Sequence, residues 1–166
     1  MKQTLRILGL DPGLGTTGWG VVETTDHQKI TCIAWGQIRT PQKQAFATRL
    51  SLLYQGVQEV ITQHHPHEAA VEETFVNQNP KSTLQLGMAR GIVLVVPANA
   101  GLVVESYGAN QVKKTVTGHG HATKDQIVHM VNHLLNLKET PPPDAADALA
   151  IALCHLQHRR WKFLTK

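Results

Sequence analysis

The chain has 166 residues, of which 42% are hydrophobic, and this suits one globular domain with a buried core. The 16 Lys and Arg residues exceed the 12 Asp and Glu residues, which gives a formal charge of +4 and favours a polyanionic partner such as nucleic acid. The first apolar run is too short for a signal peptide, and the longest apolar stretch is shorter than the roughly 20 residues that span a bilayer. We therefore expect a soluble, cytoplasmic protein with no membrane segment.

The first third of the chain is predicted to form an antiparallel meander followed by a helix. Short β-rich runs at residues 4–10, about 18–25 and about 29–38 are joined by Gly-rich or polar turns. Apolar residues then recur at helical spacing over residues 46–64, which predicts a crossover helix.

The rest of the chain is predicted to alternate between strands and helices. The expected elements are a strand at 67–72, a helix at 82–96, a strand at 102–106 and helices at about 109–117, 124–137 and 143–160. This alternation implies that part of the sheet is parallel. We expect an α/β fold, a mixed five-stranded sheet flanked by helices, in a single domain over residues 1–166.

Acidic residues are scarce, yet several lie at the ends of predicted apolar elements. Asp11 ends the first strand and Glu72 ends the fourth. Sites in open α/β sheets collect at the carboxyl ends of strands, and neighbouring strands lie about 4.8 Å apart, so these two carboxylates could share a metal. Asp144 and Asp147 are spaced i, i+3 at the start of the last helix, which presents both on one face.

Each acid also has a simpler interpretation. An Asp-Pro-Gly turn accounts for Asp11, an ordinary strand-end charge for Glu72, and helix capping for Asp144 with Asp147. One shared metal site explains all four acids, whereas the separate interpretations require three coincidences. Carboxylate oxygens are the ligands that Mg²⁺ prefers, and a basic protein around such a site suits a polyanionic substrate.

Six short motifs occur in order along the chain. They are residues 7–13 (ILGLDPG), 17–20 (TGWG), 71–75 (VEETF), 86–91 (LGMARG), 111–116 (QVKKTV) and 144–150 (DAADALA). In combination they resemble the RuvC family of bacterial Holliday junction resolvases, and the resemblance covers essentially the whole chain. It implies an RNase H-like fold, a homodimer, and Mg²⁺-dependent cleavage of four-way junctions by paired symmetric nicks in DNA recombination and repair. It also implies RuvA and RuvB as branch-migration partners.

The resemblance gives the four acids a common role. Asp11, Glu72, Asp144 and Asp147 match the metal-binding positions of the family. Two Mg²⁺ ions about 3.5 to 4 Å apart, for which Mn²⁺ can substitute, clamp the attacking and leaving oxygens in such sites. We expect Asp11 to bridge the ions, Glu72 to bind one, and Asp147 with Asp144 to bind the other, although Asp144 could instead only cap its helix.

Four further residues are candidates for DNA contact. Lys113 and Lys124 match positions that contact DNA or support catalysis, and Lys114 is a further candidate for phosphate contact. Simple solvation is the alternative for all three lysines. Phe75 matches a base-stacking wedge, for which a small satellite core is the alternative.

Gly87 and Gly91 lie one helical turn apart in the predicted helix at 82–96, so another helix could approach closely there. Internal packing is one interpretation of this spacing. The resemblance instead implies a dimer contact on this helix.

Other function classes remain open at this point. A generic RNase H-like nuclease acting on another nucleic acid is the nearest, and its choice of substrate would distinguish it. A non-catalytic junction-binding module would bind without metal-dependent cleavage. An ATP-binding protein of the actin and sugar-kinase type also uses an early Asp beside a Gly-rich hairpin, but the chain lacks room for its second domain.

Overall fold

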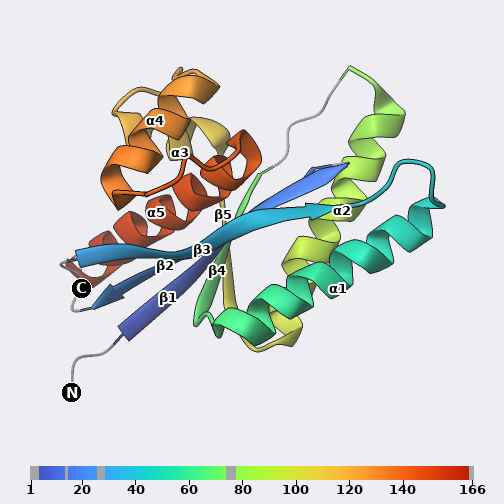
Figure 1. Ribbon diagram of the computed structural model, residues 1–166, viewed down its shortest axis with the longest axis horizontal. Coiled ribbons are helices and arrows are strands. Elements are labelled where there is room, and N and C mark those ends of the chain that lie inside the picture. The colour runs from blue at the N-terminus through green and yellow to red at the C-terminus, as the bar shows by residue number, and fades with distance from the viewer. Residues whose placement is uncertain (1–3, 14, 26–28, 74–77, 165–166) are drawn as a thin grey trace.

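A mixed sheet of five strands forms the centre of the fold (Figure 1). The computed structural model describes residues 4–13, 15–25, 29–73 and 78–164, with side chains up to residue 159. The strands, in chain order, are β1 (Thr4–Asp11), β2 (Thr16–Thr25), β3 (Lys29–Arg39), β4 (Glu68–Glu72) and β5 (Val103–Tyr107). Their order across the sheet is β3-β2-β1-β4-β5. The first three strands are antiparallel, and β4 is parallel to both β1 and β5.

Helices cover both faces of this sheet (Figure 1). The first face carries α1 (Phe46–His64) and α2 (Pro80–Asn99), and the second carries α3 (Ala109–Thr117), α4 (Lys124–Leu135) and α5 (Pro143–Leu164). In β1 the buried Leu8 packs with the α1–α2 side and the buried Ile7 with the α3–α5 side. Side chains alternate between the two faces of a strand, so Asp11 faces the same side as Ile7. The mixed α/β architecture predicted from the sequence is confirmed.

The predicted element boundaries hold closely, and the differences have local causes. The α1 and α3 boundaries are as predicted. The α2 helix begins at Pro80, earlier than predicted, because the Asn79 side chain accepts hydrogen bonds from the backbone N–H groups of the first turn. The α4 helix ends before Asn136, which takes a left-handed conformation with φ of 48°. Among the residues with described backbone, no helix has the length and apolar character needed to cross a membrane.

Pro97 does not end α2, contrary to the prediction of a helix that stops at Val96. The helix continues to Asn99 with Pro97 in its last turn. Proline removes one backbone donor, but its own carbonyl still accepts a hydrogen bond, here from the Leu102 N–H at 3.1 Å. The free-energy cost of the missing hydrogen bond is therefore confined to the last turn of a helix that packs along the sheet.

Helix α5 lies directly on the backbone of β1 and β2. A Cβ atom on Gly9 would lie 1.9 Å from the backbone oxygen of Ala148, and one on Gly18 would lie 1.9 Å from the backbone oxygen of Asp144. Neither distance is possible for a real side chain. Because Gly9 and Gly18 have no side chains, the start of α5 can pack directly over the end of β1.

We predict that Gly9→Ala destabilises the fold by about 2 to 3 kcal/mol, because the added methyl must push α5 off the sheet. Denaturant unfolding of the two proteins measures the difference. Gly15→Ala is the matched control, since the nearest atom to a Cβ there is 4.0 Å away. Equal losses in the two variants would contradict a specific contact at Gly9.

Candidate active site

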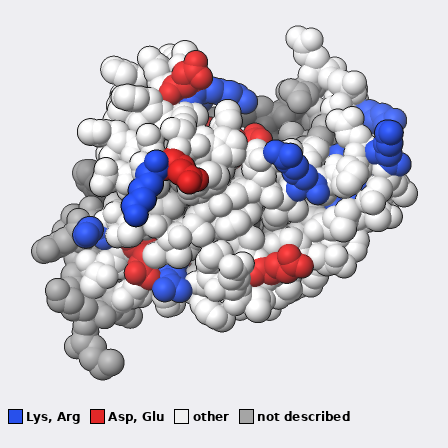
Figure 2. Space-filling view, viewed as in Figure 1, with Lys and Arg blue, Asp and Glu red and all other residues white. Residues whose placement is uncertain are grey.

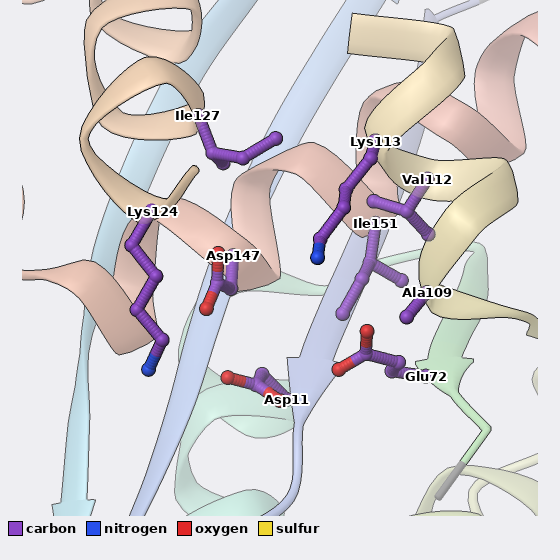
Figure 3. A pocket seen from close by; sticks show the side chains of 9 residues that line it. All are labelled: Asp11, Glu72, Ala109, Val112, Lys113, Lys124, Ile127, Asp147 and Ile151. Atoms are coloured by element: carbon purple, nitrogen blue, oxygen red, sulfur yellow. The ribbon is translucent and has the colours of Figure 1, made fainter. Parts of the chain in front are cut away.

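Three acidic side chains from distant parts of the sequence meet at one edge of the sheet. In the parallel pairing of β1 with β4, Leu10 lies opposite Val71, so Asp11 and Glu72 follow at neighbouring strand ends. Asp147 comes from the start of α5, above both strands. The three carboxylates line a cavity of about 250 Å³ (Figure 3). The structure therefore brings together three of the four predicted acids.

Two lysines enter the same cavity from the helices above the sheet. Lys113 comes from α3, and its amine points between Asp147 and Glu72 (Figure 3). Lys124 extends from the first residue of α4 on the side of Asp11. In the space-filling view, Asp or Glu atoms are visible at the base of a hollow between the α3–α4 side and the start of α2 (Figure 2).

The start of α4 is fixed by a capping box. The Thr123 hydroxyl accepts a hydrogen bond from the Gln126 N–H at 3.3 Å, and the Gln126 side chain accepts one from the Thr123 N–H at 2.9 Å. Lys124 immediately follows the cap. A defined helix start therefore determines where this lysine leaves the backbone.

The carboxyl group of Asp11 is strongly disfavoured as an anion in the metal-free protein. Burial raises its pKa to about 9, with further contributions from the charges of Glu72 and Asp147 and from a hydrogen bond to Glu72. Asp11 thus retains a proton at neutral pH and shares it with Glu72 by donating that hydrogen bond. Burial also raises the pKa of Glu72, while the bond from Asp11 and the charges of Lys113 and Lys124 lower it.

Asp147 carries part of the same electrostatic cost. Burial and then the charge of Glu72 raise its pKa to about 6, against the opposing charge of Lys124. Two lysines therefore compensate only part of the negative charge that three ionised carboxylates would place here. A bound cation would supply the missing positive charge.

The donor set fits a hard divalent cation. Carboxylate oxygens are the ligands that Mg²⁺ and Mn²⁺ use in proteins, and three carboxyl groups surround this cavity. Over the described ranges, no three Asp, Glu, His or Cys side chains already form a group that could hold an ion. The acids are gathered around a common space, and Asp11 and Glu72 are joined to each other by their shared proton.

Asp144 lies one turn before Asp147, outside the set of residues that line the cavity. Its Oδ2 atom accepts a hydrogen bond of 3.1 Å from the Gln37 side chain on β3. Gln37 reaches this position because it lies opposite Gly18 in the pairing of β2 with β3. Gln37 was not among the predicted site residues, since no motif or spacing connects residues 107 positions apart in the chain.

The remaining predicted residues lie away from the cavity or outside the described part. Lys114 is exposed on α3 and does not line the cavity. Phe75 falls outside the described residues. The cavity also has an apolar wall that was not predicted, formed by Val112, Ile127 and Ile151. These residues come from three separate helices, and sequence spacing does not show which residues of different helices meet beside the acids.

We predict that Asp11→Asn stabilises the metal-free protein. The pKa of Asp11 rises from its ordinary 3.8 to about 9 on folding, so the folded state binds more protons, and stability falls as pH increases between these two values. Asparagine stays neutral over the whole range. The gain should reach roughly 1 to 3 kcal/mol at pH 7, since one pKa unit is about 1.4 kcal/mol and the coupled carboxyls share the shift.

Denaturant unfolding with a chelator at pH 5, 7 and 8 measures this gain, which should grow with pH. Glu139→Gln is the control, because it removes one exposed acid that does not line the cavity. A constant difference across this pH range would contradict the proposed cause.

The fold is similar to that of solved resolvases. The structure titled "T. thermophilus RuvC in complex with Holliday junction substrate" matches with a TM-score of 0.87 and 36% identity, covering 95% of this chain and 96% of that one. The yeast mitochondrial Holliday junction resolvase Ydc2 matches with a TM-score of 0.69, 15% identity, and coverage of 99% and 85%. At that identity the likeness to Ydc2 concerns the fold alone.

The sequence comparisons agree over nearly the full length. A protein of Beijerinckia indica described as crossover junction endodeoxyribonuclease RuvC is 52% identical over 96% of this chain and 91% of its own. The protein of the same description from Mesorhizobium japonicum is 51% identical, with coverage of 96% and 94%. The family model "Crossover junction endodeoxyribonuclease RuvC" matches residues 7–155. This chain therefore belongs to the RuvC family of crossover junction endodeoxyribonucleases, a family of metal-dependent nucleases.

Proposed function

We propose that this chain resolves four-way DNA junctions in recombination and repair by hydrolysing phosphodiester bonds at the acidic cavity, with paired symmetric nicks. The observation that carries the proposal is the convergence of Asp11, Glu72 and Asp147 opposite Lys113 and Lys124. Acids for a divalent cation and cations for a phosphate are the two requirements of this reaction. The Thermus relative with a junction bound supports a junction as the substrate.

Each acid has a proposed part in binding metal. Asp11 would be the ligand shared between two Mg²⁺ ions, Glu72 would hold one ion, and Asp147 with Asp144 would hold the other; Mn²⁺ would replace Mg²⁺. When bound, the ions supply an activated water and stabilise charge on the attacking and leaving oxygens. Asp11 must give up its proton to act as a ligand, which the added positive charge favours. Gln37 orients Asp144 by its hydrogen bond, whether Asp144 ligates or only caps its helix.

The two cavity lysines act on the phosphate in this proposal. Lys113 and Lys124 point into the cavity and already oppose its negative charge, since they lower the pKa of Glu72 and Asp147. A scissile phosphate entering the cavity would meet both amines, which neutralise its charge and orient it. Cavity hydroxyl or thiol nucleophiles are not needed, because water is the nucleophile.

Two contacts beyond the cavity belong to the same proposal. The exposed Lys114 on α3 binds a more distant phosphate of the junction. Phe75, three residues after Glu72 in the sequence, acts as a wedge that stacks on a base near the cut. We also propose RuvA and RuvB as the partners that deliver the junction, on the basis of family membership alone.

We propose a homodimer formed through α2, because paired nicks require two sites related by a twofold axis. This helix leaves large apolar side chains in contact with solvent: Leu84 is 63% exposed and Met88 is 45% exposed. A Cβ on Gly87 or Gly91 would meet nothing within 4 Å. An open face of small and apolar residues favours close packing against a second helix.

The first test is cleavage of a labelled four-way junction beside a linear duplex and an RNA–DNA hybrid, with Mg²⁺. Wild type should nick only the junction, in symmetric pairs. Asp11→Asn should bind the junction normally and cut it at least about 100-fold more slowly, because it empties the metal site and leaves the basic surface intact.

Each contrary result would have a different meaning. Cleavage of the hybrid would indicate a generic RNase H-like nuclease. Junction binding by wild type without any metal-dependent cleavage would indicate a binding module. Loss of binding in Asp11→Asn would contradict the separation of binding from chemistry.

We predict that Gly91→Leu shifts the protein from dimer to monomer without lowering the stability of the monomer. The new side chain has open space within the chain itself, and glycine is the less favourable residue in a helix by about 1 kcal/mol. Sedimentation over a concentration series measures the equilibrium. Met88→Leu, which preserves the size and apolar character of this face, is the control and should remain dimeric. An unchanged monomer–dimer equilibrium in Gly91→Leu would indicate that the dimer contact does not lie on α2.

A further inference from the structure

Arg90 connects helix α2 to the strand end that carries Glu72. Its Nε donates a hydrogen bond to the backbone oxygen of Glu72 at 3.3 Å, and its Nη2 donates one to the Ser106 hydroxyl at 2.9 Å. Ser106 lies on β5, next to β4. One half-buried guanidinium therefore joins a helix to the ends of two adjacent strands.

The end of β4 needs such support because its pairing with β1 stops before Glu72. The last β1–β4 pair is Leu10 with Val71. On the other side Glu72 still pairs with Tyr107, and the Glu73 N–H donates to the Tyr107 oxygen at 2.9 Å. The Glu72 backbone is thus held by β5 on one side, and Arg90 supplies a contact from α2.

We propose that Arg90 is a positioning residue that sets the backbone of Glu72 and, through it, the Glu72 carboxylate at the metal site; this rests on the proposed function. The guanidinium contacts the carbonyl of Glu72, whereas Lys113 and Lys124 act on the charge of its carboxylate. Groups that orient a metal ligand typically change metal affinity or activity by about 10- to 100-fold when removed.

The same contact links the site to the open face of α2. Arg90 is the neighbour of Gly91 and lies less than one turn from Gly87, on the helix that we propose as the dimer contact. A shift of α2 against a second copy would therefore move the donors that hold Glu72.

The test compares Arg90→Met, which keeps length and removes every donor, with Arg90→Lys, which keeps the charge but cannot bridge two acceptors in the same planar geometry. Mn²⁺ binding is measured by calorimetry without DNA, and single-turnover cleavage is measured across a Mg²⁺ series with junction affinity and sedimentation. Lys138→Met, which replaces an exposed lysine that does not line the cavity, controls for the lost charge.

Arg90→Met should bind Mn²⁺ about 10-fold or more weakly and need a correspondingly higher Mg²⁺ concentration for half-maximal cleavage. Arg90→Lys should fall between it and wild type, and Ser106→Ala should cause a smaller change in the same direction. Junction affinity of Arg90→Met should match that of Lys138→Met, and junction affinity of Arg90→Lys, which keeps the charge, should match that of wild type.

Unchanged Mn²⁺ affinity and Mg²⁺ dependence in Arg90→Met would overturn the proposal. So would an equal loss in Arg90→Lys that is accompanied by unfolding, since that would indicate a general structural role. Failure of the proposed function has a different signature, because wild type would then cut no junction while its Mn²⁺ binding could still depend on Arg90.

Discussion

The close contact between α5 and the bare backbone of β1 and β2 is the constraint on which the site depends. Gly18 lies opposite Asp11 in the β1–β2 pairing, and the backbone oxygen of Asp144 occupies the space where its side chain would be. An ordinary residue at this position would lift the helix and carry Asp147 away from the strand ends. Asp11 and Asp147 are 136 residues apart in sequence, and they meet because Gly9 and Gly18 have no side chains that would hold α5 off the sheet.

Holding these acids together has an electrostatic cost that the rest of the fold must offset. The raised pKa of Asp11 has burial as its main cause, followed by repulsion from its neighbours, so the folded protein would be more stable without this carboxyl. The buried layers on both faces of the sheet supply the stability against which that repulsion acts. A bound cation relieves this repulsion, and the relief adds to its affinity, because the fold has already gathered the carboxylate ligands without enough positive charge to balance them.

Much of this arrangement follows from the sequence, and the parts that do not are long-range. Asp11 and Glu72 could be paired in advance, because each ends an apolar run and parallel neighbours end at the same edge. The length of α2 could not be predicted, since proline normally ends a helix and Pro97 is tolerated here only because it lies in the last turn. The roles of Gln37 and Arg90 could not be predicted from the sequence either. Their contacts depend on strand register and on a helix crossing two strand ends, which local pattern does not encode.

The position of α5 along its own axis is fixed at the other end of β4. Buried His155 contacts the Glu68 carboxylate at 2.7 Å, and Arg159 donates to its other oxygen at 2.8 Å. Burial alone would raise the pKa of Glu68, but these hydrogen bonds bring it below its usual value, so the carboxylate stays charged at neutral pH.

The distance between the two contact points along β4 matches the distance between their partners along α5. Glu68 and Glu72 are four residues apart in a strand, or about 13 Å. Asp147 and His155 are eight residues apart in a helix, or about 12 Å. A strand and a helix that run past each other with equal spacing can therefore meet at both ends at once. A slip of α5 by one turn, about 5.4 Å, would break the Glu68 contacts and remove Asp147 from Glu72 together. The contacts of Glu68 with His155 and Arg159 at one end of β4 thus help to set the geometry of the acids at the other end.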